Sequence, residues 1–320
     1  MAETLLVPAP KGLPESGARA VIGRSLFDGT FPLPVAVLRD DALTANIATM
    51  ARFTDDAGAL LAPHAKTTMS PQIVARQLDA GAWGMTAATA WQAARVAEMG
   101  VDRIVLANEV TDPGSLRLLQ DLLDARPDLT VWAYADSVDS LAALDSVAPQ
   151  RPGSLRILIE LGFPGGRTGV RSPAQARDLA LLAARRRHPV AGVAAFEGTL
   201  TAEDLPATIA RVDAFLGEVG SLAVSLATDG LLTTDEPFVT VGGSAYPDRA
   251  VAVLAEPLAA AGLRLVLRSG CYVTHDHGAY AATSPFGDDP RVGLRLRPAI
   301  EVWGAVLSRP EPELDRKSVV

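Results

Sequence analysis

The fold is decided by a repeating unit that is clearest at residues 130–161, which read TVWAY (Thr130–Tyr134), SVDSLAAL (Ser137–Leu144) and LRILIEL (Leu155–Leu161). The first and third segments are short runs rich in apolar and β-branched side chains, which predicts buried strands. The middle segment has the apolar spacing of a helix and begins with serine, a common helix cap. This crossover is long enough to bring the two strands parallel.

The same unit recurs along most of the chain. Eight strands are predicted, at residues 59–63, 83–87, 103–106, 130–134, 155–161, 191–196, 238–241 and 264–267. Helices are predicted between them, at residues 71–79, 90–99, 115–124, 137–144, 173–186 and 204–216. Eight such strands with crossover helices favour an α/β fold of the (β/α)8 TIM-barrel type. An open doubly wound sheet is the alternative, although no G-x-G-x-x-G follows the first strand.

The predicted barrel domain spans residues 31–270 and is preceded by a leader over residues 1–30. Within this domain, a strand at residues 33–38 and a helix at residues 40–53 precede the eight repeats. We therefore expect an N-terminal strand in addition to the barrel strands.

A different pattern begins at residue 271, where the alternation of strand and helix stops. Residues 293–303 read as strands of a second, β-rich domain over residues 271–320. We expect this second domain to be incomplete and the natural protein to be longer.

Composition limits the classes of function. The 320 residues are 48% hydrophobic and 21% charged, which is typical of a globular protein. The net charge of −8 and the scattered basic residues make nucleic acid an unexpected partner. Cys271 is the single cysteine, the first residues lack the pattern of a signal peptide, and no apolar stretch is long enough to span a membrane. We expect a cytoplasmic protein without a membrane partner.

Polar residues that follow the predicted strands are the candidates for a functional site, because such barrels form their active sites at the carboxyl ends of the strands. The first barrel strand leads into Pro63-His64-Ala65-Lys66-Thr67. Burial at the barrel mouth would lower the pKa of the lysine and leave a neutral amine that can form a Schiff base. The alternative is a solvated lysine at a strand end.

Two further strand ends suit an anionic ligand. Val241-Gly242-Gly243-Ser244 ends the seventh strand, and its glycines and hydroxyl would let backbone N–H groups close around a phosphate. The fifth strand leads to GGRTGVR (residues 165–171), where Arg167 could anchor a carboxylate, a phenolate or a ring nitrogen. Either segment could instead be a plain turn. A lysine, a phosphate loop and an arginine at one barrel mouth together indicate a cofactor.

These residues also carry a resemblance to a known family. Pro63–Thr67 is similar to the Pro-His-x-Lys-Thr motif of the D-serine dehydratase and D-threonine aldolase group, a branch of the alanine racemase-fold (fold type III) pyridoxal-phosphate enzymes. RSGCYVTHDHG (residues 268–278) resembles the bacterial amino-acid deaminase subgroup in particular, and the match covers roughly residues 30–310. The resemblance implies a barrel of the alanine racemase N-terminal type with pyridoxal 5'-phosphate on Lys66.

The reaction that the resemblance implies is a lyase reaction on a small D-amino acid. Lys66 would hold the cofactor, yield it to the substrate amine and then take the α-proton, while the cofactor ring accepts electrons. Loss of a β-hydroxyl would give a keto acid and ammonia, as in a deaminase or dehydratase. The candidate catalytic residues are Lys66, His64, Tyr134 and His275, and the candidate cofactor-binding residues are Lys66, Arg167, Gly242, Gly243 and Ser244.

Other interpretations stay open. The same scaffold could serve an amino-acid racemase or a D-threonine-type aldolase, and a non-catalytic protein that binds pyridoxal phosphate is a third possibility. His275 and His277 would share one face of a strand and could ligate a metal, but they make at most half a site, and a proton relay or a hydrogen-bonded turn fits equally. A divalent metal is a possibility only in a full-length form, for which we also expect a homodimer.

Overall fold

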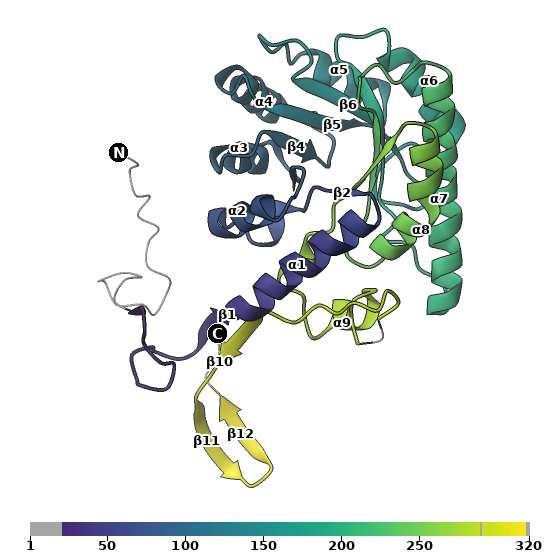
Figure 1. The fold of residues 1–320 in the computed structure, drawn as a ribbon. Coiled ribbons are helices and arrows are strands. Elements are labelled where there is room, and N and C mark those ends of the chain that lie inside the picture. The colour runs from purple at the N-terminus through teal and green to yellow at the C-terminus, as the bar shows by residue number, and fades with distance from the viewer. Residues whose placement is uncertain (1–20, 289, 318–320) are drawn as a thin grey trace.

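The chain folds into a barrel with a small β-ribbon beside it (Figure 1). The computed structural model describes residues 21–288 and 290–317. Residues 1–20 of the predicted leader and the last three residues therefore lie outside the described part of the chain. Among the described helices, none combines the length and the apolar composition that crossing a membrane requires.

The eight predicted barrel strands are confirmed. They are β2 (Leu60–Leu61), β3 (Met85–Ala87), β4 (Arg103–Leu106), β5 (Thr130–Ala135), β6 (Leu155–Leu161), β7 (Val190–Ala195), β8 (Phe238–Val241) and β9 (Arg264–Leu267). They run parallel in the order β2-β9-β8-β7-β6-β5-β4-β3. The sheet closes between β2 and β3, where the N–H of Thr86 donates to the carbonyl of Pro63 (2.8 Å) and that of Trp83 to Leu61 (2.8 Å). The closed barrel excludes the open doubly wound sheet.

Helices alternate with these strands. They are α2 (Pro71–Asp79), α3 (Ala90–Glu98), α4 (Pro113–Ala125), α5 (Val138–Asp145), α6 (Pro173–Ala183), α7 (Leu205–Thr228) and α8 (Pro247–Ala260). The prediction that the sixth of these ends at residue 216 was wrong. The helix continues because buried apolar residues recur at helical spacing in its second half, at Val219, Leu222, Ala223 and Leu226.

The core has two parts, one inside the barrel and one between the strands and the helices. Inside the barrel, Trp132 packs against Trp83 and Phe238, with ring centroids 4.9 Å and 5.7 Å away. Phe238 is the first residue of β8, so these rings fill the barrel near the amino ends of its strands. This end of the barrel is therefore packed with side chains.

The C-terminal region differs from its prediction. Only part of residues 293–303 is strand: β10 (Ile300–Trp303) pairs antiparallel with β1 (Val35–Leu38), and β11 (Val306–Glu311) pairs with β12 (Leu314–Lys317). The N-terminal strand thus pairs with the ribbon and not with the barrel.

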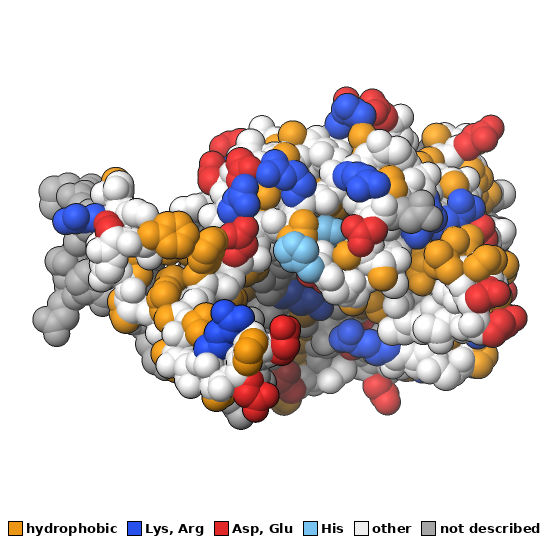
Figure 2. Space-filling view, turned by 90° about the horizontal axis from the view of Figure 1, so that it is seen from below, with side chains coloured by type: hydrophobic (Ala, Val, Ile, Leu, Met, Phe, Trp, Pro, Cys, Tyr) orange, Lys and Arg blue, Asp and Glu red, His pale blue; other side chains and the backbone are white. Residues whose placement is uncertain are grey.

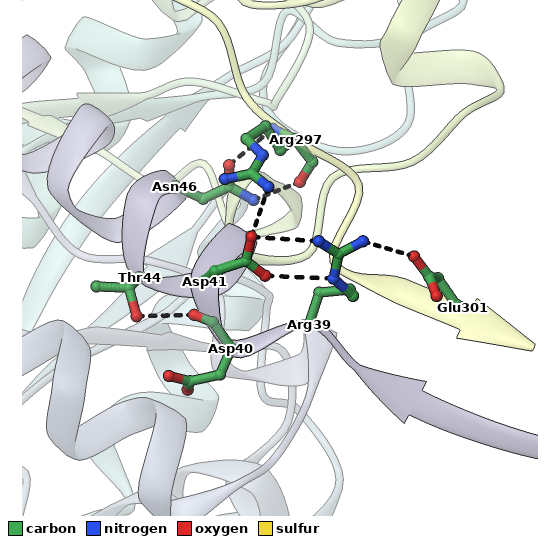
Figure 3. Close-up of polar contacts among 7 residues, drawn as sticks. All are labelled: Arg39, Asp40, Asp41, Thr44, Asn46, Arg297 and Glu301. Carbon is green, nitrogen blue, oxygen red and sulfur yellow. Dashed lines mark hydrogen bonds and ion pairs between the residues drawn. The ribbon is translucent and has the colours of Figure 1, made fainter. Parts of the chain in front are cut away.

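Residues 293–299 are not a strand, because their backbone groups bond to separate segments: Arg297 to helix α1 (Asp40–Asp56), Leu296 to Phe286 and Ala299 to Thr274. Figure 3 shows this contact, in which the buried Asn46 bonds the backbone N–H and carbonyl of Arg297 at 2.8 Å and 2.7 Å. The Arg297 guanidinium also meets Asp41 at 2.6 Å, and Arg39 joins Asp41 to Glu301 of the ribbon. These bonds fasten the start of the second domain to the barrel.

Charges of both signs are dispersed over the face that Figure 2 shows, while hydrophobic side chains gather on the projecting lobe. The exposed apolar residues of the ribbon are Ile300, Val302, Trp303, Val306 and Leu307.

Candidate functional site

A cavity of about 450 Å³ lies at the carboxyl ends of the barrel strands. Its lining brings together residues at the carboxyl ends of all eight strands, among them Lys66, Tyr134, Glu160, Arg167, Phe196, Ser244 and Arg268. Of the residues predicted for the site, His64, Lys66, Tyr134, Arg167, Gly242, Gly243 and Ser244 all line this cavity. His275 does not: it lies in a tightly packed patch behind Cys271, with Met50 and Tyr280. Its catalytic role stays a prediction.

Lys66 is positioned by a single 3₁₀ turn, Ala65–Thr67, that follows β2. Ala65 is buried, and its carbonyl accepts the N–H of Met69 at 2.8 Å, which fixes the turn. The lysine side chain is exposed toward the cavity and not buried as expected, because the barrel mouth is open. Lys66 can thus meet a ligand in the cavity.

His64, at the start of this turn, is half-buried, and its Nδ1 has no hydrogen-bond partner among the described residues. Burial is the main cause that lowers the pKa of His64 to about 3, and the positive charges of Arg268, Lys66 and Arg167 add to it. The imidazole is therefore neutral near pH 7 and can exchange a hydrogen bond with a bound molecule.

Arg268 directly follows β9 and is buried beside Tyr134 of β5, with its guanidinium 5.7 Å from the ring centroid. It donates to the Thr240 hydroxyl (2.9 Å) and to the carbonyl of Ala195 (2.7 Å). The Nε of Arg268 and the hydroxyl of Tyr134 have no partner within the described part of the chain. Sequence reasoning did not assign Arg268 to the site, although its place at a strand end was a sufficient signal.

The glycines of the predicted phosphate loop are already engaged. The N–H groups of Gly242 and Gly243 donate to the carboxylate of Glu197, which follows β7, at 3.2 Å and 2.8 Å. Ser244 lies one residue further on, and its hydroxyl accepts the N–H of Cys271 at 3.3 Å. Gly270 packs so closely on His64 that an added Cβ would lie 2.7 Å from the His64 Cβ.

Backbone donors for an anion remain at the ends of β8 and β9. The N–H groups of Ser244, Ala245, Ser269 and Gly270 have no acceptor among the described residues, and all four residues line the cavity. Successive backbone N–H groups that are free at such turns can form an anion-binding nest. The turns after the two glycines are therefore further candidates for a phosphate site, and the role of Gly242 and Gly243 stays a prediction.

Arg167 lines the cavity from the loop that follows β6 and is exposed. The other arginine of this loop has a structural role, since Arg171 donates to the carbonyls of Thr168 (2.8 Å) and Gly166 (3.0 Å). Only Arg167 therefore has a place in the site.

Sequence reasoning missed an acidic group. Glu109, Asp136 and Glu160 each place a carboxylate oxygen within 4.8 Å of the other two. In the part of the chain that the structure describes, this is the one group of three side chains that could hold a metal ion. Burial, and the neighbouring carboxyl of Glu109, raise the pKa of Glu160 to about 9. Glu160 is therefore protonated near pH 7 and is a neutral acid on the cavity wall.

His275 and His277 do not lie on a strand. His275 has a φ of 48°, and the Asp276 carboxylate accepts the N–H groups of Gly278 (2.8 Å) and Tyr280 (3.0 Å). This segment is a hydrogen-bonded turn, which was one of the two alternatives to a metal site.

Comparison with known proteins identifies relatives. The family model for the alanine racemase N-terminal domain matches residues 38–231. The chain is 27% identical to a D-threonine aldolase from Arthrobacter sp. over 88% of its own length and 69% of that protein. It is 31% identical to the D-threo-3-hydroxyaspartate dehydratase of Delftia sp. (strain HT23), over 44% of this chain and 36% of that one.

The fold agrees with these matches. The crystal structure of D-threonine aldolase from Filomicrobium marinum superposes with a TM-score of 0.72 at 23% identity, covering 88% of this chain and 71% of that one. The relatives of this chain thus include lyases named for D-amino acids, and the resemblance inferred from the lysine motif is confirmed. Since the family model matches more than half of the chain, this protein belongs to the alanine racemase N-terminal domain family.

Proposed function

We propose that this chain binds pyridoxal 5'-phosphate through Lys66 and is a lyase that removes ammonia from D-amino acids bearing a β-hydroxyl. One observation carries the proposal: Lys66, Arg268 and the free N–H groups of Ser244 and Gly270 converge on one cavity. The dehydratase and aldolase among the relatives support a substrate of this class.

The residues of the cavity fit the cofactor. Pyridoxal 5'-phosphate has an aldehyde that reacts with an amine, a flat ring and a phosphate. The cavity offers an amine at Lys66, buried groups without a partner at Arg268 and Tyr134, and free backbone N–H groups beside Ser244. Lys66 would hold the aldehyde carbon, and Ser244 and Gly270 the phosphate. When bound, the cofactor withdraws electrons from the substrate α-carbon.

The protein side chains would manage the protons. Lys66 lines the cavity and would serve as the base for the α-proton. Glu160 is held in its protonated form, so it can donate a proton to a departing β-hydroxyl, which then leaves as water. His64 stays neutral and can bind the substrate or the cofactor without changing charge.

The pKa values of His64 and Glu160 favour dehydration over aldol cleavage. Breaking the Cα–Cβ bond requires a base that takes the proton from the β-hydroxyl. Within the cavity wall, His64 has a pKa of about 3 and Glu160 already carries its proton, so both are poor bases. The aldolase is nevertheless the second candidate, because the D-threonine aldolase match covers most of the chain.

Cofactor attachment is tested with the absorbance spectrum of the purified chain in pyridoxal 5'-phosphate, followed by borohydride reduction and peptide mass spectrometry. The sequence has three lysines, Lys11, Lys66 and Lys317, so the other two serve as internal controls. We expect a long-wavelength band in the parent, no band in Lys66→Ala, and the reduced adduct on Lys66. An adduct confined to Lys11 or Lys317 would refute the proposal.

The reaction is tested by giving the loaded protein D-threonine and analysing the products. Deamination gives 2-oxobutanoate and ammonia, aldol cleavage gives glycine and acetaldehyde, and racemisation changes only the configuration at the α-carbon. We expect 2-oxobutanoate and ammonia in equal amounts, and Glu160→Gln should slow their release without removing the absorbance band. Glycine as the main product would establish the aldolase instead, and a bound cofactor without turnover of D-serine or D-threonine would indicate a non-catalytic binding protein.

A further inference from the structure

We propose that Glu197 is a positioning residue for the cofactor phosphate: its carboxylate locks the Gly242–Gly243 turn so that the donors of Ser244 and Gly270 face the phosphate. This inference rests on the proposed function, since it concerns how the same cavity holds the same cofactor. Glu197 is fully buried at the barrel mouth, and the proposed reaction gives its carboxylate no other role.

The contact itself has the form of an anion site. Glu197 is 0% exposed, and its two carboxylate oxygens accept two consecutive N–H groups, from Gly242 at 3.2 Å and from Gly243 at 2.8 Å. Gly242 has a φ of +101°, a conformation that other residues rarely adopt. Hydrogen bonds to an ionised acceptor are roughly twice as strong as neutral ones. The glutamate thus stabilises a backbone conformation that is otherwise unfavourable.

The locked turn determines where the next donors lie. The carbonyl of Gly243 accepts the Ser269 hydroxyl at 2.9 Å, and the Ser244 hydroxyl accepts the N–H of Cys271 at 3.3 Å. One network therefore connects the carboxyl ends of β7, β8 and β9, with Glu197 at its origin. Without the carboxylate, the N–H groups of Gly242 and Gly243 would lose their acceptor. Ser244 and the Ser269–Cys271 turn would then no longer be held in a fixed position relative to each other.

The direction in which phosphate affinity changes when Glu197 is neutralised tests the inference. A buried carboxylate near a phosphate repels it, so neutralising the glutamate would strengthen phosphate binding if repulsion were its main effect. If positioning dominates, Glu197→Gln weakens phosphate binding, because the amide NH₂ cannot accept the second N–H and leaves it unpaired.

The experiment compares pyridoxal 5'-phosphate with pyridoxal, which lacks the phosphate, in the parent chain and in Glu197→Gln. Dissociation constants come from absorbance titrations of the lysine-bound form, and the internal ring closure of free pyridoxal affects parent and variant equally. We expect the affinity for pyridoxal phosphate to fall about tenfold or more, with little change for pyridoxal. Asp213→Asn is the matched control: it removes a carboxylate that pairs with Arg249 on the barrel exterior, and should change neither constant.

The outcomes separate this inference from the proposed function. If the parent forms no adduct with either compound, the proposed function fails and this inference fails with it. If the parent binds both but Glu197→Gln binds pyridoxal phosphate as tightly as before or more tightly, only the role of Glu197 is refuted. Equal weakening of both ligands would also refute it, since the glutamate would then support the fold and not the phosphate.

Amide exchange in the parent chain gives a second measurement, which stays valid if the variant does not fold. The N–H groups of Gly242 and Gly243 should be protected before the cofactor is added, because Glu197 already accepts them. Those of Ser244 and Gly270 should become protected only when the cofactor binds. Protection of Gly242 and Gly243 that first arises with the cofactor would place the phosphate on the glycines and overturn the inference.

Discussion

At the scale of single residues, His64 shows how the site affects stability. Burial and three nearby positive charges lower its pKa to about 3, while a histidine in an unfolded chain titrates near 6.5. Between these two pH values the unfolded state binds one proton more than the folded state. The free energy of unfolding therefore rises with pH across this window, and the contribution of His64 is lost as the pH falls toward 3.

We predict that His64→Gln reduces this pH dependence by about one proton, or at most about 1.4 kcal/mol per pH unit. Glutamine fills a similar volume but does not titrate. Urea unfolding of parent and variant between pH 5 and pH 6.5 measures the two slopes. If the slopes are equal, His64 is not held neutral by its surroundings.

At the scale of secondary-structure elements, helix caps explain why so many helix starts could be predicted. The side chains of Thr89, Asp112, Ser137, Ser172 and Asp204 each accept a backbone N–H in the first turn of the helix that follows. Such caps are local in sequence. Helices α2 and α8 have no side-chain cap, and α8 was the one barrel helix with no prediction.

The contact between α1 and residues 293–299 is a second element-scale feature, and it depends on Asn46. Its amide NH₂ donates to the carbonyls of Val273 (3.1 Å) and Arg297 (2.7 Å), and its oxygen accepts the N–H of Arg297 at 2.8 Å. We predict that Asn46→Ala lowers the free energy of unfolding by roughly 2 to 3 kcal/mol, because buried backbone groups lose their partners. Urea unfolding measures the loss.

The control for this prediction is Thr44→Ala, since its exposed hydroxyl donates to the carbonyl of Asp40 in the same helix (Figure 3) and accepts from the Arg76 guanidinium, and neither partner belongs to the C-terminal segment. It should change the free energy of unfolding by no more than about 0.5 kcal/mol. Similar losses for the two variants would show that α1 itself, and not its contact with the C-terminal segment, accounts for the effect.

At the scale of the whole molecule, the barrel and the ribbon contribute unequally to stability. The barrel holds nearly all of the buried apolar side chains, whereas every residue of β11 is exposed. We predict that ending the chain after Trp303 changes the free energy of unfolding by less than about 1 kcal/mol, because few apolar contacts are lost. Urea unfolding and the cofactor absorbance band together test this. A larger loss, or a missing band, would mean that the hairpin supports the barrel mouth.

Much of the fold could be predicted from the sequence because its signals are local. Apolar runs marked the eight strands within a residue or two, and the rule that barrel sites form at strand ends pointed to Lys66, Tyr134, Arg167 and Ser244. The same rule, applied more fully, would have found Arg268 and Asp136, which directly follow their strands. The family resemblance through the lysine motif was likewise local.

The tertiary structure decided what depends on contacts between distant segments. Glu197 reaches Gly243 across 46 positions of sequence and takes the N–H that was predicted for a phosphate, and Asn46 draws residues 293–299 away from a strand across about 250. Glu160 becomes a neutral acid only because the fold buries it against Glu109. Hydrophobic periodicity and capping act over a few residues and so can be read along the chain, whereas hydrogen-bond partners and burial exist only once the barrel has closed.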